Sequence, residues 1–194
     1  MALTPSTMLT LGTKAPAFEL VNAVDGTLIR SVDYVGERGF LVMFICNHCP
    51  YVIHLKEAMA ELARDAQARG FGVVAINSND VSNPKYADDR PEKMKEDAEQ
   101  FEYSFPYCFD EDQSVARAYQ AACTPDFFLF DASQSLAYRG RFDASRPGND
   151  EPIDGKDLRE ALAAVEVGGS VVGEQYPSMG CNIKWKPGQE PDYF

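Results

Sequence analysis

Two cysteines and a histidine lie together in the segment Cys46-Asn47-His48-Cys49. A continuous apolar run, residues 40–45, precedes this segment, and apolar residues recur at helical spacing from Pro50 onward. The segment therefore lies where a buried strand leads into a helix. Residues of these types support three chemistries, which are thiol–disulfide exchange, reduction of a peroxide and metal binding.

The position of Cys46 favours a reactive thiol. A cysteine at the start of a helix lies beside unpaired backbone N–H groups and the positive end of the helix dipole. In C-x-x-C segments the pKa of the first cysteine falls from ~8.5 to roughly 3.5–7.5. We predict that Cys46 attacks, that Cys49 resolves the mixed disulfide, and that His48 stabilises the thiolate. The structural alternative is a pair of small buried side chains.

The same residues offer ligands to a metal ion. Cys46, His48, Cys49 and His54 are all of ligand type, so a metal-binding module or copper chaperone is an alternative function. A structural zinc site normally contains a second pair of ligands. The sequence has only two histidines and no second C-x-x-C segment. We therefore predict no bound metal and no organic cofactor.

Composition narrows the class of protein. A chain of 194 residues with 45% hydrophobic residues suits one globular domain. The net charge of -12 disfavours binding to nucleic acid or to an anionic membrane. The N-terminal segment lacks the pattern of a signal peptide, and no apolar run is long enough to cross a bilayer, which predicts a cytoplasmic protein. Five cysteines, an odd number, do not suggest a secreted disulfide framework.

Apolar periodicity predicts a strand, helix and strand around the cysteines. Residues 40–45 and 71–77 are expected to be buried strands, joined by an amphipathic helix from Pro50 to Gly70 in a right-handed crossover. A hairpin is expected around Asp25-Gly26. Three further helices are expected, over residues 91–103, 112–121 and 156–167. Extended segments are expected over residues 105–109, 126–131 and 138–142.

Two motifs carry a resemblance to a known family. The segment Cys46-Asn47-His48-Cys49-Pro50 follows the buried strand, and Cys123-Thr124-Pro125 precedes the strand at 126–131. With these motifs the sequence resembles the thioredoxin superfamily, and within it the peroxiredoxin-like (AhpC/TSA-type redoxin) subgroup with a CNHC motif. The resemblance implies an α/β thioredoxin fold, with a central mixed β-sheet flanked by helices on both faces, an N-terminal hairpin and an irregular C-terminal tail. One domain, 1–194, is expected, with a core of about 18–165 and an extension of about 166–194.

The resemblance also implies an activity and a substrate site. Pro125 matches the cis-proline that lies against the C-x-x-C segment in such folds, and Thr124 would pair with an extended substrate. The implied function is a thiol–disulfide oxidoreductase that acts on protein or small-molecule disulfides and thiols, with a thioredoxin-type reductant as a partner. The alternative is a thiol peroxidase with Cys49 or Cys46 as the peroxidatic thiol. Val42 and Cys46 stand where the peroxiredoxin motif has proline and a hydroxyl residue, which weakens that alternative.

Three cysteines lie outside the C-x-x-C segment. Cys108 is expected to be structural, and Cys123, two residues before Pro125, is expected to be buried near the site. Cys181 lies in the tail after a glycine, and a tail can fold back onto the domain. It is therefore a candidate third redox thiol that exchanges with the pair, and an inert thiol is the alternative.

Overall fold

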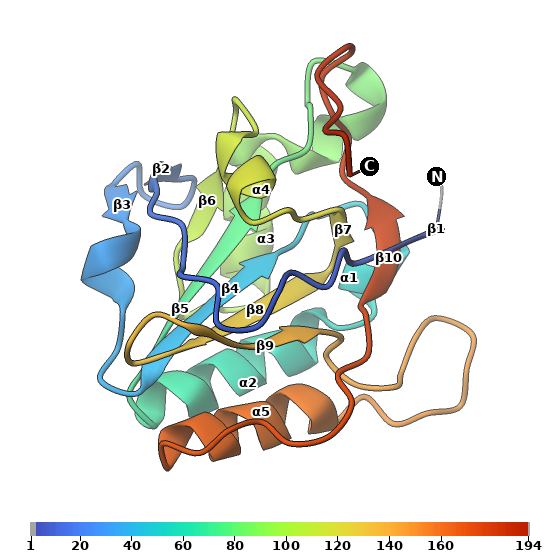
Figure 1. The fold of residues 1–194 in the computed structure, drawn as a ribbon. Helices are drawn as coiled ribbons and strands as arrows, with labels where there is room; N and C mark the ends of the chain where they lie inside the picture. The colour runs from blue at the N-terminus through green and yellow to red at the C-terminus, as the bar shows by residue number, and fades with distance from the viewer. Residues whose placement is uncertain (1–2, 194) are drawn as a thin grey trace.

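A mixed β-sheet forms the centre of the protein, whose computed structural model describes residues 3–193. Its strands are β2 (Glu19–Asn22), β3 (Leu28–Arg30), β4 (Gly39–Phe44), β5 (Phe71–Asn77), β6 (Tyr107–Phe109), β8 (Asp126–Asp131) and β9 (Leu136–Gly140). Their order is β3-β2-β6-β5-β4-β8-β9 (Figure 1). The β4–β5 and β5–β6 pairs are parallel and the other pairs are antiparallel. The predicted mixed sheet is confirmed.

Strand β4, which leads to the cysteines, is buried along its whole length. Leu41 and Met43 face one hydrophobic core, while Phe40, Val42 and Phe44 face a second core on the other side of the sheet. A strand that is covered on both faces needs apolar residues at every position, because successive side chains point to opposite faces. The continuous apolar run at 40–45 follows from this double burial.

Helices cover both faces of the sheet, as predicted. The first core includes residues of α1 (Pro50–Ile53), α2 (Lys56–Ala68), α3 (Pro91–Gln100) and α5 (Lys156–Glu166). The second core includes residues of α4 (Ser114–Ala118), and two short 3-10 helices, η1 (Ser31–Tyr34) and η2 (Pro84–Asp89), lie in connections. The helix expected from Pro50 to Gly70 is interrupted at His54 and Leu55, so it forms α1 and α2.

A second, smaller sheet joins an N-terminal and a C-terminal segment to β7, the strand that precedes Pro125. It consists of β1 (Leu3–Pro5), β10 (Met179–Asn182) and β7 (Cys123–Thr124), in the order β1-β10-β7. Figure 1 shows β10 between β1 and β7. The expectation of an irregular tail is wrong at β10, because these residues obtain their backbone hydrogen bonds from two segments that are distant in sequence.

Within residues 3–193, the structure contains no helix of the length and apolar character that crossing a bilayer requires. The longest helix, α2, has 13 residues, which is short of the roughly 20 apolar residues needed. The cytoplasmic location and the domain bounds given above stay predictions.

Candidate active site

The two sulfurs of the C-x-x-C segment lie on either side of Thr124. Cys46 follows β4 and Cys49 is the N-cap of α1, and neither residue is exposed to solvent. Cys46 Sγ lies 3.1 Å from Thr124 Oγ1, and Cys49 Sγ lies 3.2 Å from the Thr124 carbonyl oxygen. The Thr124–Pro125 peptide bond is cis, as the resemblance implies. The tertiary structure therefore brings Thr124 and Pro125 to the cysteines.

Hydrogen-bond donors converge on the sulfur of Cys49. The Cys46 thiol donates to it and, against the opposing effect of burial, lowers the pKa of Cys49 to about 5, with further help from the Cys181 thiol and the backbone N–H of Val52. In the thiol form, Cys49 instead donates to the Thr124 carbonyl oxygen. Hydrogen bonds to the charged form favour that form, so these contacts favour the thiolate of Cys49.

The pKa of Cys46 moves in the opposite direction. Burial raises it well above the ordinary value, and the hydrogen bond that Cys46 donates to Cys49 and the negative charge of Asp89 raise it further. The order of the two pKa values is thus the reverse of the predicted one. The helix begins at Pro50, so it is Cys49 and not Cys46 that receives an N–H group of the first turn.

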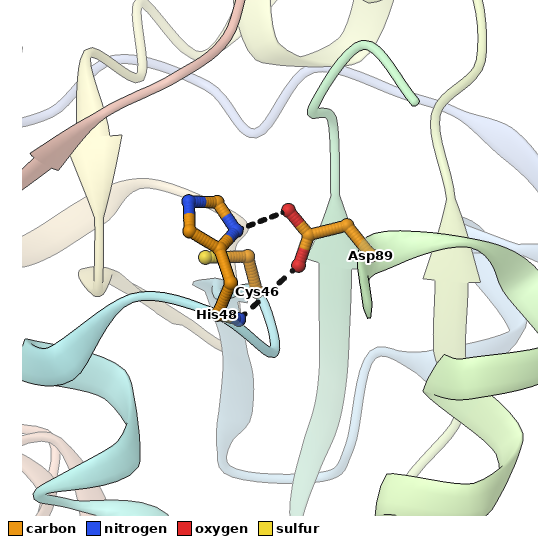
Figure 2. Close-up of side chains that lie close together, drawn as sticks. All are labelled: Cys46, His48 and Asp89. Carbon is orange, nitrogen blue, oxygen red and sulfur yellow. Dashed lines mark hydrogen bonds and ion pairs between the residues drawn. The ribbon is translucent and has the colours of Figure 1, made fainter. Parts of the chain in front are cut away.

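Asp89 holds the loop between the two cysteines. Its Oδ1 accepts the backbone N–H groups of Asn47, at 2.8 Å, and His48, at 3.3 Å. Its Oδ2 lies 2.5 Å from His48 Nδ1 and accepts Asn79 Nδ2 at 2.8 Å (Figure 2). Asp89 is fully buried. Sequence reasoning placed it in a loop without a role, since neither spacing nor residue type links position 89 to position 48.

His48 lies close to both Cys46 and Asp89. Figure 2 shows its ring beside the sulfur of Cys46 and the carboxylate of Asp89. Cys46, His48 and Asp89 each present a ligand-type atom within 4.8 Å of the others, the one such group found in the described part of the chain. A carboxylate has about four lone-pair sites, and Asp89 already accepts at least three hydrogen bonds, so a metal ion would have to displace them. This occupancy weighs against a metal site.

His54 does not join this group. Its Nε2 lies 3.2 Å from Ser145 Oγ, at a small surface pocket that Pro125 also lines. Arg141 and Arg146 line the same pocket. Asp143 lies in the same wall, and Arg141 is paired with Asp157, so the pocket carries charges of both signs.

A buried ion pair supports the loop from below. Lys56, at the start of α2, pairs with Asp97 of α3, and its Nζ donates to the Asn47 carbonyl oxygen at 3.4 Å. The Tyr107 hydroxyl donates to Asn47 Oδ1 at 3.0 Å. Both backbone and side chain of Asn47 are thus fixed, which holds the residues that separate the two cysteines.

The remaining cysteines differ in their distance from the pair. Cys108 is buried in the core that α4 covers, and burial raises its pKa to about 12. Cys123 is buried beside the site, and its thiol points to the Pro125 carbonyl oxygen at 3.7 Å. Cys181, on β10, contacts Cys49, and burial together with that contact raises the pKa of Cys181 to about 12. The structure thus places the tail cysteine at the pair.

Strand β10 also occupies the backbone edge that the resemblance assigns to a substrate. Cys181 pairs with Thr124, and Asn182 pairs with Cys123, in antiparallel register. An extended substrate therefore has no access to the edge of Thr124 while β10 is in place. The assignment of Thr124 and Pro125 to substrate positioning stays a prediction.

One family model matches most of the chain. The family model described as the AhpC/TSA family matches residues 11–139, which include Cys46, Cys49 and the Thr124–Pro125 bond. No match was found among curated proteins.

Solved structures show similar folds. An uncharacterized conserved protein from Geobacillus kaustophilus is 48% identical, with a TM-score of 0.93 over 96% of this chain and 98% of that one. A hypothetical protein from Sinorhizobium meliloti 1021 is 45% identical, with a TM-score of 0.91 over 95% of this chain and 100% of that one. A thiol:disulfide interchange protein of the thioredoxin family from Chlorobium tepidum TLS is 18% identical, with a TM-score of 0.60 over 81% and 98%. The thioredoxin fold is thereby confirmed.

Proposed function

We propose that this chain, which belongs to the AhpC/TSA family, is a thiol–disulfide oxidoreductase whose redox pair is Cys46 and Cys49. One observation carries the proposal. The two sulfurs are in hydrogen-bond contact beside the cis Thr124–Pro125 bond, and the contact stabilises one of them as a thiolate. A reactive thiolate with a second thiol in contact is the arrangement that disulfide exchange requires.

The pKa order favours Cys49 as the attacking sulfur and Cys46 as the resolving one, the reverse of the assignment made from the sequence. The Cys49 thiolate attacks one sulfur of a substrate disulfide, so a Cys49–substrate bond forms and the substrate S–S bond breaks. The first substrate thiolate leaves and takes up a proton. Cys46 then loses its proton and attacks Cys49, which forms the Cys46–Cys49 disulfide and releases the second substrate thiol. Two electrons pass from the pair to the substrate, and the reverse sequence oxidises a dithiol.

Cys46 needs a base when it resolves the mixed disulfide, because its pKa is raised. His48 lies within 4.8 Å of Cys46, and Nδ1 of its ring faces Asp89. A hydrogen bond from Nδ1–H to the carboxylate leaves Nε2, which is buried without a hydrogen-bond partner, as the ring nitrogen that can accept a proton. We assign His48 this role in proton transfer, with Asp89 as a positioning residue.

Trapping tests the pair and the assignment together. Removal of the resolving thiol leaves the attacking cysteine joined to its substrate as a mixed disulfide. We expect Cys46→Ser/Cys181→Ser, which also lacks the thiol in contact with Cys49, to accumulate such an adduct at Cys49 with a small probe disulfide such as oxidised glutathione, and Cys49→Ser to form none at Cys46. Cys108→Ser is the matched control for loss of a buried thiol. Capture by Cys49→Ser instead would restore the order predicted from the sequence, and capture by neither variant would refute the proposed function.

A thiol peroxidase is the second candidate, and the low pKa of Cys49 favours it. Cys49 is followed by Pro50 and carries the thiolate that attack on a peroxide requires. The hydroxyl that the motif supplies is replaced by Cys46, whereas the hydroxyl of Thr124 lies 3.1 Å from Cys46 Sγ. Consumption of hydrogen peroxide with a dithiol reductant, abolished by Cys49→Ser but retained by Cys108→Ser, would promote this candidate over the first.

The proposed partners follow from the same chemistry. Protein or small-molecule disulfides and thiols would be substrates, and a thioredoxin-type protein would be a reductant. The net charge of -12 disfavours non-specific binding to nucleic acid or to an anionic membrane. We propose a cytoplasmic location, where most thiols are kept reduced and a catalytic pair can cycle.

A further inference from the structure

The C-terminal strand β10 is packed closely against the cis-proline segment. Gly180 lies where a Cβ atom would be 2.0 Å from the Thr124 carbonyl oxygen and 3.2 Å from the Pro125 nitrogen. Real Cβ atoms do not approach backbone so closely, so only glycine permits this contact. The residue that precedes Cys181 in the tail is therefore fitted to the substrate edge of Thr124.

The register of β10 places a sulfur at the pair. Cys181 stands opposite Thr124, the residue whose hydroxyl and carbonyl groups contact Cys46 and Cys49. The Cys181 thiol donates a hydrogen bond to the Cys49 sulfur. Cys181 therefore lies in the place that the sulfur of an extended substrate would need to reach.

Cys123 provides an internal comparison. It lies next to Thr124 on β7 and is buried beside the same site. Its thiol, however, points to the carbonyl oxygen of Pro125, and Cys49 affects the pKa of Cys123 as a nearby charge and not through a hydrogen bond. Proximity alone does not place a cysteine in contact with Cys49, whereas β10 does so for Cys181.

We propose that β10 is a built-in substrate strand and that Cys181 is a second resolving thiol for Cys49. This proposal rests on the proposed function. In the oxidised protein, Cys181 loses its proton and attacks the Cys49 sulfur of the Cys46–Cys49 disulfide. The Cys49–Cys181 bond forms, the Cys46–Cys49 bond breaks, and Cys46 leaves as a thiolate that takes up a proton. No electrons are gained or lost overall, so the step needs no external oxidant.

The step moves the disulfide toward solvent. Cys46 and Cys49 have no exposed surface, whereas Cys181 is 5% exposed and is carried by a strand of the smaller sheet. A disulfide between Cys49 and Cys181 is thus the form that an external thiol reaches first. Larger substrates would require β10 to leave the edge of Thr124.

The experiment measures how much thionitrobenzoate is released when the protein reacts with dithionitrobenzoic acid (DTNB). The reaction is then quenched with acid, and the state of each cysteine is mapped by mass spectrometry. Attack of Cys49 on DTNB releases one thionitrobenzoate, and resolution of the adduct by a neighbouring thiol releases a second. We expect each molecule of Cys46→Ser to release about two thionitrobenzoates by this route and to contain a Cys49–Cys181 disulfide. We expect each molecule of the double variant Cys46→Ser/Cys181→Ser to release about one thionitrobenzoate by this route and to keep the adduct on Cys49.

The matched control is Cys46→Ser/Cys123→Ser, which removes the neighbouring cysteine that does not contact Cys49, and it should still release about two. If Cys46→Ser released only one thionitrobenzoate and kept a stable adduct on Cys49, the role of Cys181 would be overturned and the proposed function would stay intact. An unreactive Cys49 in all variants would overturn both.

A measurement on the unaltered protein does not depend on how the variants fold. Oxidation with a limiting amount of diamide, followed by mapping, should yield both the Cys46–Cys49 and the Cys49–Cys181 disulfides. A Cys46–Cys49 disulfide alone would contradict the proposal. Gly180→Ala, whose added Cβ would collide with Thr124, should reduce the Cys49–Cys181 fraction several-fold, and an unchanged fraction would likewise count against it.

Discussion

Replacement of Cys46 by alanine should raise the pKa of Cys49. The Cys46 thiol is the largest cause of the low pKa of Cys49, which is about 5. A hydrogen bond to a charged group contributes about 1.5–3 kcal/mol, and one pKa unit corresponds to about 1.4 kcal/mol, so the rise should be roughly one to two units. At about pH 6 the thiolate fraction of Cys49 would fall from roughly nine in ten to between one half and one tenth.

Cys46→Ser is the matched control, since its hydroxyl still donates a hydrogen bond and should retain most of the shift. The assay is the pH dependence of the ultraviolet absorbance of the thiolate, as the difference between each protein and the same protein carrying Cys49→Ser. A lowered pKa favours the charged form, so the signal should be present at neutral pH and disappear as the pH falls through about 5. A midpoint near the ordinary thiol value in the unaltered protein would refute the assignment of the thiolate to Cys49. Equal midpoints for the alanine and serine variants would refute the role of the Cys46 thiol.

Three further variants test the surroundings of the pair. Asp89→Asn places an NH2 group among the donors that now face Asp89, so urea unfolding should show a loss of about 1–3 kcal/mol, whereas exposed Asp88→Asn should change little. His48→Gln should slow the second release of thionitrobenzoate more than the first, because only resolution by a neutral thiol needs the base; equal slowing would contradict this role. Lys56→Met leaves the carboxylate of Asp97 buried without its cation and should cost about 3–5 kcal/mol, and Lys56→Met/Asp97→Asn should recover part of that loss.

Much of the fold follows from local patterns. The continuous apolar runs at 40–45 and 71–77 predict strands buried on both faces, and β4 and β5 form a parallel pair there. Asp25-Gly26 predicts the turn between β2 and β3. These elements are predictable because each depends on the residues within it, on apolar spacing, and on turn-forming residues at its ends.

The elements that the sequence did not predict depend on distant partners. Residues 179–182 have no alternating pattern, and they form β10 because β1 and β7 supply hydrogen bonds on both sides. Residues 84–89 read as a loop, yet their last residue, Asp89, fixes the segment between the two cysteines. No local pattern contains either relation, because the partners are about 40 or more residues apart in sequence.

At the candidate site, the spacing of Cys46 and Cys49 and their place between a strand and a helix predicted a reactive pair, and the resemblance to the thioredoxin superfamily implied that Pro125 lies against it. That spacing could not show which of the two thiols has the lower pKa. A pKa depends on burial and on the donors and charges that meet a sulfur in space. The donors that meet Cys49 come from Cys46, from the first turn of α1 and from the tail, and the charge that opposes Cys46 comes from Asp89. Only the folded chain brings these groups together, so it is the tertiary structure that favours the thiolate at Cys49 over the one at Cys46.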